Sequence, residues 1–124
     1  MLKIFRVTGY SMHPTLSHSD ILVTREKKIR TGDIVVLDLP RFGRVVKRIK
    51  SLSDGRCMLM GDNLSESSAC CLIAQSTENI IGCVVLTVRT GAMIVYKNSW
   101  IRKFKQLKRL LRIYVNLQNS GAKP

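Results

Sequence analysis

The sequence predicts a mainly β protein, with a folded β-sheet core over residues 1–96 and a basic amphipathic helix and tail over residues 97–124. Three observations predict this architecture. Short apolar runs rich in β-branched residues recur before residue 97, turn-forming residues separate them, and the apolar spacing becomes helical near residue 99. With 124 residues and 45% hydrophobic content, the chain can bury one core and is too short for two.

The expected strands are the apolar runs that lie between turn signals. They are residues 21–24, 34–37, 45–49, 57–60, 80–88 and 93–96. Turns are expected at residues 31–33 (Thr-Gly-Asp), between Pro40 and Gly43, at residues 53–55 (Ser-Asp-Gly) and at Gly91. A polar, serine-rich loop begins at residue 61. Many short strands at close spacing are typical of a compact barrel-like or folded sheet.

Residues 99–117 are expected to form the helix. At about 100° per residue, their aromatic residues and leucines fall mainly on one side and their basic residues on the other. From Lys97 onward the chain has eight Lys or Arg and no acidic residue, within a net charge of +13. The apolar side is expected to pack on the sheet or to lie on an anionic membrane surface. Nucleic acid is disfavoured as a partner, because the β region lacks the interleaved basic and aromatic residues of a base-stacking surface.

No targeting or membrane-spanning segment is expected. Residues 1–7 hold two cations and no long apolar stretch, unlike a secretory signal. No window reaches the ~18 apolar residues that a spanning helix needs. The four cysteines, at positions 57, 70, 71 and 83, match no zinc or haem spacing. We therefore expect reduced and mostly buried thiols, no metal, no cofactor, and a cytoplasmic protein, with peripheral contact to a membrane through residues 99–117 as the alternative to packing of this helix on the core.

Ser11 is the first candidate catalytic residue. It lies in the run Gly-Tyr-Ser-Met-His-Pro of residues 9–14, where glycine permits unusual backbone angles and proline opposes a helix. The hydroxyl is therefore expected on an exposed turn, with backbone N–H groups free to face a developing oxyanion. An ordinary turn serine is the alternative interpretation.

Lys47 is the second candidate. It lies in the run Val-Val-Lys-Arg-Ile of residues 45–49, where strand alternation places it on the same face as Val45 and Ile49. Burial of that face favours a neutral amine, which can accept the proton of a serine hydroxyl. Arg48, on the opposite face, is expected to stay solvated. In the alternative interpretation both faces are wet and Lys47 is a surface charge.

A histidine-based triad is a third possibility for the serine. His13 or His18 would act as the base of Ser11, with Asp20 or Asp33 as the orienting carboxylate. His13 is only two positions after Ser11, an awkward separation for a side chain that must reach back. Both histidines are therefore expected to be exposed turn residues.

Five stretches resemble the sequence boxes of the signal peptidase I family, in the family order. They are residues 9–16 (Gly-Tyr-Ser-Met-His-Pro-Thr-Leu), 31–36 (Thr-Gly-Asp-Ile-Val-Val), 46–49 (Val-Lys-Arg-Ile), 60–63 (Met-Gly-Asp-Asn) and 78–85 (Glu-Asn-Ile-Ile-Gly-Cys-Val-Val). One such box is a weak signal, whereas five in order are a strong one. The resemblance implies serine–lysine dyad chemistry and the β core that this family shares with the LexA and UmuD regulators.

The resemblance also implies roles for individual residues. Ser11 would attack the scissile carbonyl, and Lys47 would take its proton and pass it to the leaving amine. The N–H of Ser11 would contact the oxyanion, with Gly9 and Met12 as supporting positions, and a backbone donor must serve where some relatives have a hydroxyl in place of Gly9.

The hydroxyl that orients the lysine amine is matched by spacing to Ser67. Ser65 and Ser68 are close enough in sequence to compete for this role. The family often continues with Asp-Ser-Arg, a supporting ion pair, whereas residues 69–71 here are Ala-Cys-Cys. The membrane anchor of the family is also missing, so the chain is expected to be a minimal catalytic core.

The expected function is that of a serine endopeptidase that processes a precursor or a signal or leader peptide after small residues. The polypeptide substrate would bind as an extended strand along a sheet edge. Two alternatives stay open. One is a LexA- or UmuD-like protein that cuts its own chain, against which only ten residues precede Ser11. The other is a catalytically decayed binding module that acts through its basic helix.

Overall fold

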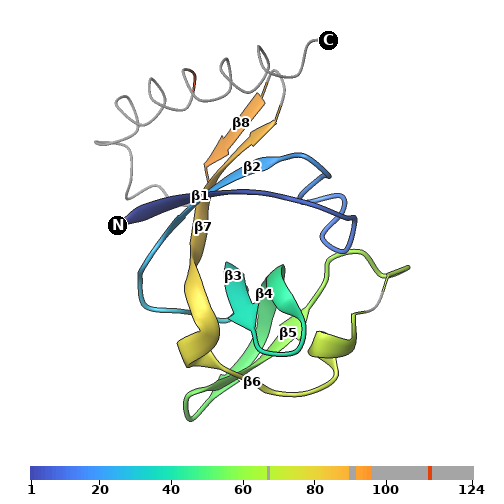
Figure 1. Cartoon of the computed structure of the whole chain (residues 1–124), viewed down its shortest axis with the longest axis vertical. Helices are drawn as coiled ribbons and strands as arrows, with labels where there is room; N and C mark the ends of the chain where they lie inside the picture. Colours follow the sequence, from blue (N-terminus) through green and yellow to red (C-terminus); the bar gives the residue numbers. More distant parts are fainter. Residues whose placement is uncertain (67, 90–91, 96–111, 113–124) are drawn as a thin grey trace.

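The computed structural model describes residues 1–66, 68–89, 92–95 and 112. In this part of the chain an eight-stranded antiparallel sheet forms the body of the protein (Figure 1). The strands are β1 (Leu2–Arg6), β2 (Ile21–Arg25), β3 (Ile34–Leu39), β4 (Gly43–Ser53), β5 (Arg56–Met60), β6 (Gln75–Ser76), β7 (Ile80–Arg89) and β8 (Ala92–Val95), with 3-10 turns η1 (Ala69–Cys71) and η2 (Thr77–Asn79). The order is β1-β2-β7-β3-β4-β5-β6, and β8 pairs with β7. The prediction of a mainly β fold is confirmed.

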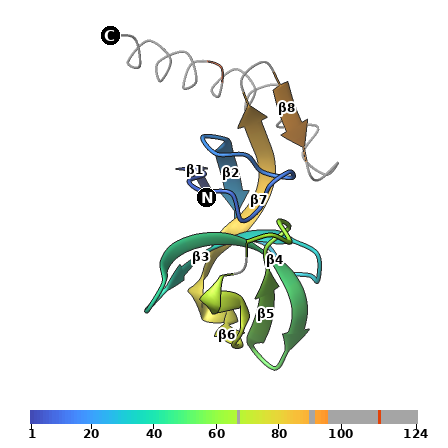
Figure 2. The ribbon, with the colours of Figure 1, turned by 90° about the vertical axis from the view of Figure 1, so that its right-hand side faces the viewer.

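Strand β7 joins the two halves of the sheet. Its first residues pair with β3, and its later residues pair with β2 and β8. The sheet therefore bends along β7, and β1 and β2 come to lie over the hairpin of β3 and β4 (Figures 1 and 2). Gly82 lies where β7 passes closest to β2, because a Cβ atom there would be 3.0 Å from Thr24 Oγ1. Glycine inside a strand marks such a close approach.

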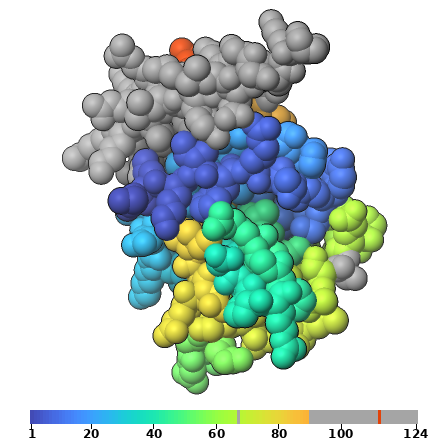
Figure 3. All heavy atoms as spheres, viewed as in Figure 1, coloured from blue at the N-terminus to red at the C-terminus, as the bar shows by residue number. Residues whose placement is uncertain are grey.

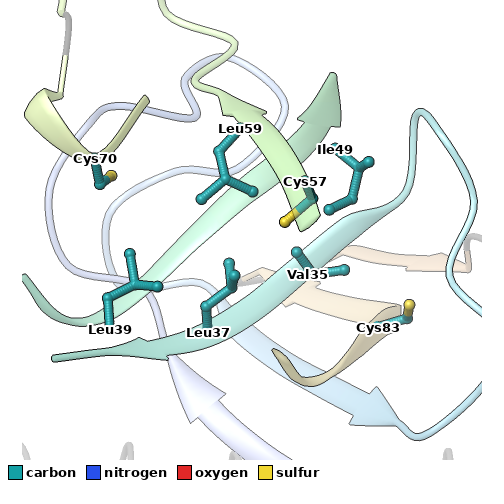
Figure 4. Packing of buried hydrophobic residues seen from close by; sticks show 8 residues of the cluster. All are labelled: Val35, Leu37, Leu39, Ile49, Cys57, Leu59, Cys70 and Cys83. Carbon is teal, nitrogen blue, oxygen red and sulfur yellow. The ribbon is translucent and has the colours of Figure 1, made fainter. Parts of the chain in front are cut away.

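Two clusters of buried side chains lie on either side of the central strands. The first contains Val35, Leu37, Leu39, Ile49, Cys57, Leu59, Cys70 and Cys83 (Figure 4). The second contains Val7, Met12, Leu16, Leu22, Ile34, Val36 and Val84. Alternation along β3 sends Val35 to the first cluster and Val36 to the second, which explains why this strand is an unbroken apolar run.

The strands differ from the expected ones mainly at the edges of the sheet. Each expected apolar run lies in a strand as far as its residues are described, residue 96 being outside them. Strand β4 is longer than residues 45–49, and strands β1 and β6 were not expected. The expected helix over residues 99–117 lies outside the described residues, except for Arg112. Among the helices of the described residues, none has the length and apolarity that crossing a membrane requires.

Candidate active site

The turn that carries Ser11 is anchored in the second core cluster. Met12 and Leu16 are 1% and 0% exposed, and the Leu16 N–H donates a hydrogen bond of 2.9 Å to the Met12 carbonyl. Gly9 has a φ of 88°, which side chains disfavour, and this lets the chain reverse just before the serine. Met12 and Leu16 therefore anchor the turn in the core, and Ser11 itself is half-buried at its edge.

Lys47 comes to the same place from the middle of β4. It pairs with Val35 across the ladder, and its side chain is only 3% exposed. Val45 and Ile49, which alternate with it along the strand, pack with the first core cluster. The face of β4 that carries Lys47 is therefore apolar, as strand alternation predicts.

The lysine amine lies between two hydroxyl groups. Lys47 Nζ is 2.8 Å from Ser11 Oγ and 2.9 Å from Ser68 Oγ. Within the described residues, no carboxylate lies within ion-pair distance of this nitrogen. Its polar contacts in the described residues are therefore hydrogen bonds to hydroxyl groups rather than an ion pair. Ser67, the serine expected to orient the amine, lies outside the described residues, and among the described serines of this loop Ser68 contacts the amine.

The loop after β5 holds the Ser11 turn from the other side. The Asn63 N–H donates to the Ser11 carbonyl at 2.9 Å, and the Asn63 side-chain amide donates to the Tyr10 carbonyl at 2.9 Å. Gly61 lies so close that a Cβ atom there would be 2.7 Å from the Ser11 carbonyl oxygen. Glycine is therefore required at position 61 for this contact, and Asn63 is a positioning residue that reasoning on the sequence did not single out.

An ion pair links this loop to the strand of Lys47. Arg48 Nε and Nη2 donate to the two oxygens of Asp62 at 2.8 and 2.7 Å, and the Thr15 hydroxyl donates to Asp62 at 2.6 Å. Hydrogen bonding from Arg48, and then from Thr15, lowers the pKa of Asp62, although burial opposes the shift. The expectation that Arg48 stays solvated is wrong, because a loop distant in sequence brings a carboxylate to it.

A cleft of about 390 Å³ opens beside the Ser11 hydroxyl. One wall is formed by residues 4–8, at and after β1, and the other by residues 44–47 of β4. Among the described residues, β1 pairs only with β2, and residues 43–47 pair only with β3. Both walls therefore present unpaired strand edges. In Figure 3 the blue N-terminal strand lies against the teal residues of the β3–β4 hairpin on the same face.

Comparison with protein-family models matches residues 1–85 to Peptidase S24-like, which covers more than half of the chain. The chain belongs to the Peptidase S24-like family. No curated protein and no solved structure matches it. The family match supports the LexA-like side of the sequence resemblance, and it does not single out signal peptidase I.

In this S24-like chain three residues of the alternative histidine triad, His18, Asp20 and Asp33, have other partners. His18 Nδ1 accepts a hydrogen bond of 3.0 Å from the Gly9 N–H, and its ring stacks on Tyr10. Asp20 pairs with Arg89 at 2.9 Å, and Asp33 pairs with Lys27 at 2.9 Å. The structure therefore brings Ser11 together with a lysine rather than with a histidine.

The cysteines of the S24-like chain are all free thiols. Cys70 lies in the Ala-Cys-Cys segment of residues 69–71, and it is buried in the first core cluster. The Gln75 side-chain amide donates to the Cys70 carbonyl at 3.1 Å. Burial raises the pKa of the Cys70 thiol, so it stays neutral beside Lys47. Apolar packing thus holds this segment, which positions Ser68. In the described part of the chain, no group of three His, Cys, Asp or Glu gathers as metal ligands do.

Proposed function

We propose that this protein is a serine endopeptidase in which Ser11 is the nucleophile and Lys47 the general base. One observation carries the proposal, namely the 2.8 Å separation of Lys47 Nζ and Ser11 Oγ at a buried lysine. A nucleophile and a base within hydrogen-bond distance, beside a third group that orients the base, are the arrangement that covalent catalysis needs. Ser68, at 2.9 Å from the amine, is the orienting group.

The reaction follows from this geometry. The Ser11 hydroxyl donates its hydrogen bond to the neutral Lys47 amine and transfers the proton as Oγ attacks the scissile carbonyl. The resulting ammonium gives a proton to the leaving amine when the C–N bond breaks, which leaves an acyl-enzyme. A water molecule then attacks the ester, with Lys47 again taking the proton and returning it to Ser11 Oγ as the product acid leaves.

Backbone donors beside Ser11 are available for the oxyanion. Among the described residues, the N–H groups of Ser11 and Met12 have no acceptor, although the carbonyls around them are engaged. Each preorganised oxyanion donor contributes about 2.7–4 kcal/mol to the stabilisation of the transition state. Gly9 carries no side chain, so a backbone donor takes the place of the hydroxyl that some relatives supply there.

The substrate would be a polypeptide bound as an extended strand. The unpaired edges of β1 and of residues 43–47 face the cleft beside Ser11, and an inserted peptide can form ladder hydrogen bonds with either edge. The resemblance to signal peptidase I adds a precursor, signal or leader peptide with small residues before the cut as the substrate class.

The dyad is tested with purified full-length protein and internally quenched peptides that have alanine before the intended cut. Ser11→Ala and Lys47→Ala should each lower kcat/KM at least about a thousandfold. Lys47→Arg should not restore activity, because a guanidinium does not give up its proton. Lys50→Ala is the matched control, since this exposed lysine lies on the same strand. Equal cleavage by the wild type and Ser11→Ala would exclude the dyad.

Cleavage of its own chain is a second candidate function, and the S24-like family match favours it. LexA and UmuD cut themselves upstream of the serine. Intact-mass measurements after long incubation distinguish the candidates, because self-cleavage yields two fragments that Ser11→Ala does not produce. If the mass of the protein stays unchanged and the quenched peptides are cleaved, the result supports action on a separate substrate. A stable mass, no peptide cleavage and no labelling of Ser11 by a serine-directed probe would indicate a non-catalytic module.

A further inference from the structure

Two arginines, Arg6 and Arg44, belong to the lining of the cleft, and no acidic residue does among those described. Lys47 lies at the buried end beside Ser11, whereas Arg44 lies toward solvent, where an entering peptide passes. Concave surfaces lined by one sign of charge attract ligands of the opposite sign.

Arg44 extends from one wall of the cleft to the other. Its guanidinium carbon is 5.1 Å from the centre of the Phe5 ring, so a residue of β4 rests on a residue of β1. Stacking on an aromatic face holds a guanidinium in place and leaves its N–H groups directed outward. The side chain is therefore positioned at the path of a peptide that runs between the two strands.

The partner that Arg44 has within the protein is a weak one. Its Nη2 lies 3.7 Å from Asp38 Oδ2, and the two side chains are 58% and 60% exposed. Exposed pairs of this kind contribute little, because water and salt screen them. Arg44 has five N–H donors, so a carboxylate inside the cleft can pair with it without competition from a strong internal ion pair.

The register along β4 gives the position that Arg44 contacts. Arg44 precedes Lys47 by three residues, which corresponds to about 10 Å of extended strand. A peptide that pairs with this edge places one of its residues opposite Arg44, about three positions from the residue opposite Lys47. Because Lys47 lies beside Ser11, the peptide residue opposite Lys47 adjoins the scissile bond.

We propose that the cleft selects extended peptides with an Asp or Glu about three positions from the cleaved bond, and that Arg44 is the residue that recognises this carboxylate. The proposal rests on the proposed peptidase function and names its substrate class. It makes Arg44 a specificity-determining residue, which affects the choice of substrate and leaves the chemistry at Ser11 unchanged.

The test uses full-length protein and a set of internally quenched, alanine-rich peptides. A single Glu is placed at each position around the cut, with Gln and Lys sets of the same design. At low salt, we expect one position, about the third from the cut, to show a preference for Glu. At this position kcat/KM should be about fivefold higher with Glu than with Gln. Lys at that position should lower it, and added salt should reduce the preference for Glu.

Two variants of Arg44 and one matched control assign the preference. Arg44→Gln should remove the preference for Glu, and Arg44→Glu should reverse it in favour of Lys. Arg41→Gln removes a charge from an exposed arginine outside the cleft lining and should leave the preference intact. The reversal cannot arise from loss of folding, so it separates recognition from a general loss of structure.

The possible outcomes separate this inference from the function on which it rests. Cleavage without any charge preference, or a preference that Arg44→Gln retains, would overturn the role of Arg44 and leave the peptidase standing. No cleavage of any peptide, together with no binding of labelled peptides by Ser11→Ala, would overturn the peptidase and this inference with it. Peptide binding can also support the inference when no peptide is cleaved. In that case Ser11→Ala binds Glu peptides more tightly than Gln peptides, and the double variant with Arg44→Gln binds both equally.

Discussion

Arg48 and Asp62 meet through two parallel hydrogen bonds, of 2.8 Å from Nε to Oδ1 and 2.7 Å from Nη2 to Oδ2. Arg48 follows the lysine of the candidate dyad, and Asp62 also accepts a hydrogen bond from Thr15, which lies in the Ser11 turn. One carboxylate thus connects the strand that carries Lys47 with the turn that carries Ser11. Because a bidentate pair allows little sliding, it maintains the spacing between Ser11 and Lys47.

Loss of the Asp62 carboxylate is expected to weaken both the fold and the site. Asp62→Asn should lower the free energy of unfolding by about 2 kcal/mol, since Arg48 and Asp62 are only 29% and 13% exposed and hydrogen bonds to charged groups are strong. Asp38→Asn breaks the exposed 3.7 Å pair with Arg44 and should cost about 0.5 kcal/mol or less. Denaturant unfolding measures both variants. Equal losses of unfolding free energy in the two variants would show that the Arg48–Asp62 pair stabilises the fold no more than the exposed pair does.

The same carboxylate gives the stability a defined pH dependence. The pKa of Asp62 is lowered in the folded protein, first by hydrogen bonding from Arg48. Its contribution is therefore fully present above the unfolded pKa of about 3.9 and is lost as the pH falls through the lower folded value. The difference in unfolding free energy between the wild type and Asp62→Asn should shrink as the pH is lowered from 5 to about 2. A constant difference over that range would contradict the linkage.

A methyl group at position 61 is expected to displace the nucleophile. In Gly61→Ala the new Cβ would be 2.7 Å from the Ser11 carbonyl oxygen, so the Ser11 turn must shift. We expect a destabilisation of about 1–3 kcal/mol and a loss of Ser11 reactivity toward a serine-directed probe. Gly55→Ala is the control, because its φ of 74° strains a side chain at a distant hairpin. Gly55→Ala should lower stability and leave the labelling of Ser11 by the probe unchanged. Equal labelling of Gly61→Ala and Gly55→Ala would contradict the importance of the contact between position 61 and Ser11.

The first core cluster should account for much of the stability of the described sheet. Leu59 is 1% exposed within this cluster, and Leu59→Ala is expected to cost about 2–5 kcal/mol through lost burial and a residual cavity. Leu64 is 95% exposed, so Leu64→Ala should change the free energy of unfolding by about 0.5 kcal/mol or less. Chemical denaturation measures the unfolding free energy of both leucine variants. A small change in Leu59→Ala as well as in Leu64→Ala would contradict the prediction.

Central strands could be predicted from the sequence because their signal is local. The run at residues 34–37 is apolar on both faces, since β3 lies between two core clusters. Strand β1 gave no such signal, because Leu2 and Ile4 are exposed and the charged Lys3 lies between them. The two residues of β6 are too short to form a pattern. Both strands exist through pairing with distant partners.

In the candidate site too, local features could be predicted from the sequence, whereas contacts between distant segments could not. The face of Lys47 followed from alternation along one strand, and Ser11 was found from its motif. Spacing along a loop could not decide which of several neighbouring serines would reach the lysine, since a loop has no fixed side-chain period. The ion pair of Arg48 was missed for a related reason, because its carboxylate comes from the loop after the next strand.

From its residues alone, this chain specified a mainly β body and two candidate catalytic side chains, because strand periodicity and turn chemistry act over a few neighbours. Tertiary structure decided that these side chains meet at 2.8 Å, that Ser68 contacts the amine, and that Arg44 reaches across a cleft to β1. Those relationships depend on how the sheet bends along β7. A bend of this kind is set by the packing of whole strands and leaves no mark in a short stretch of sequence.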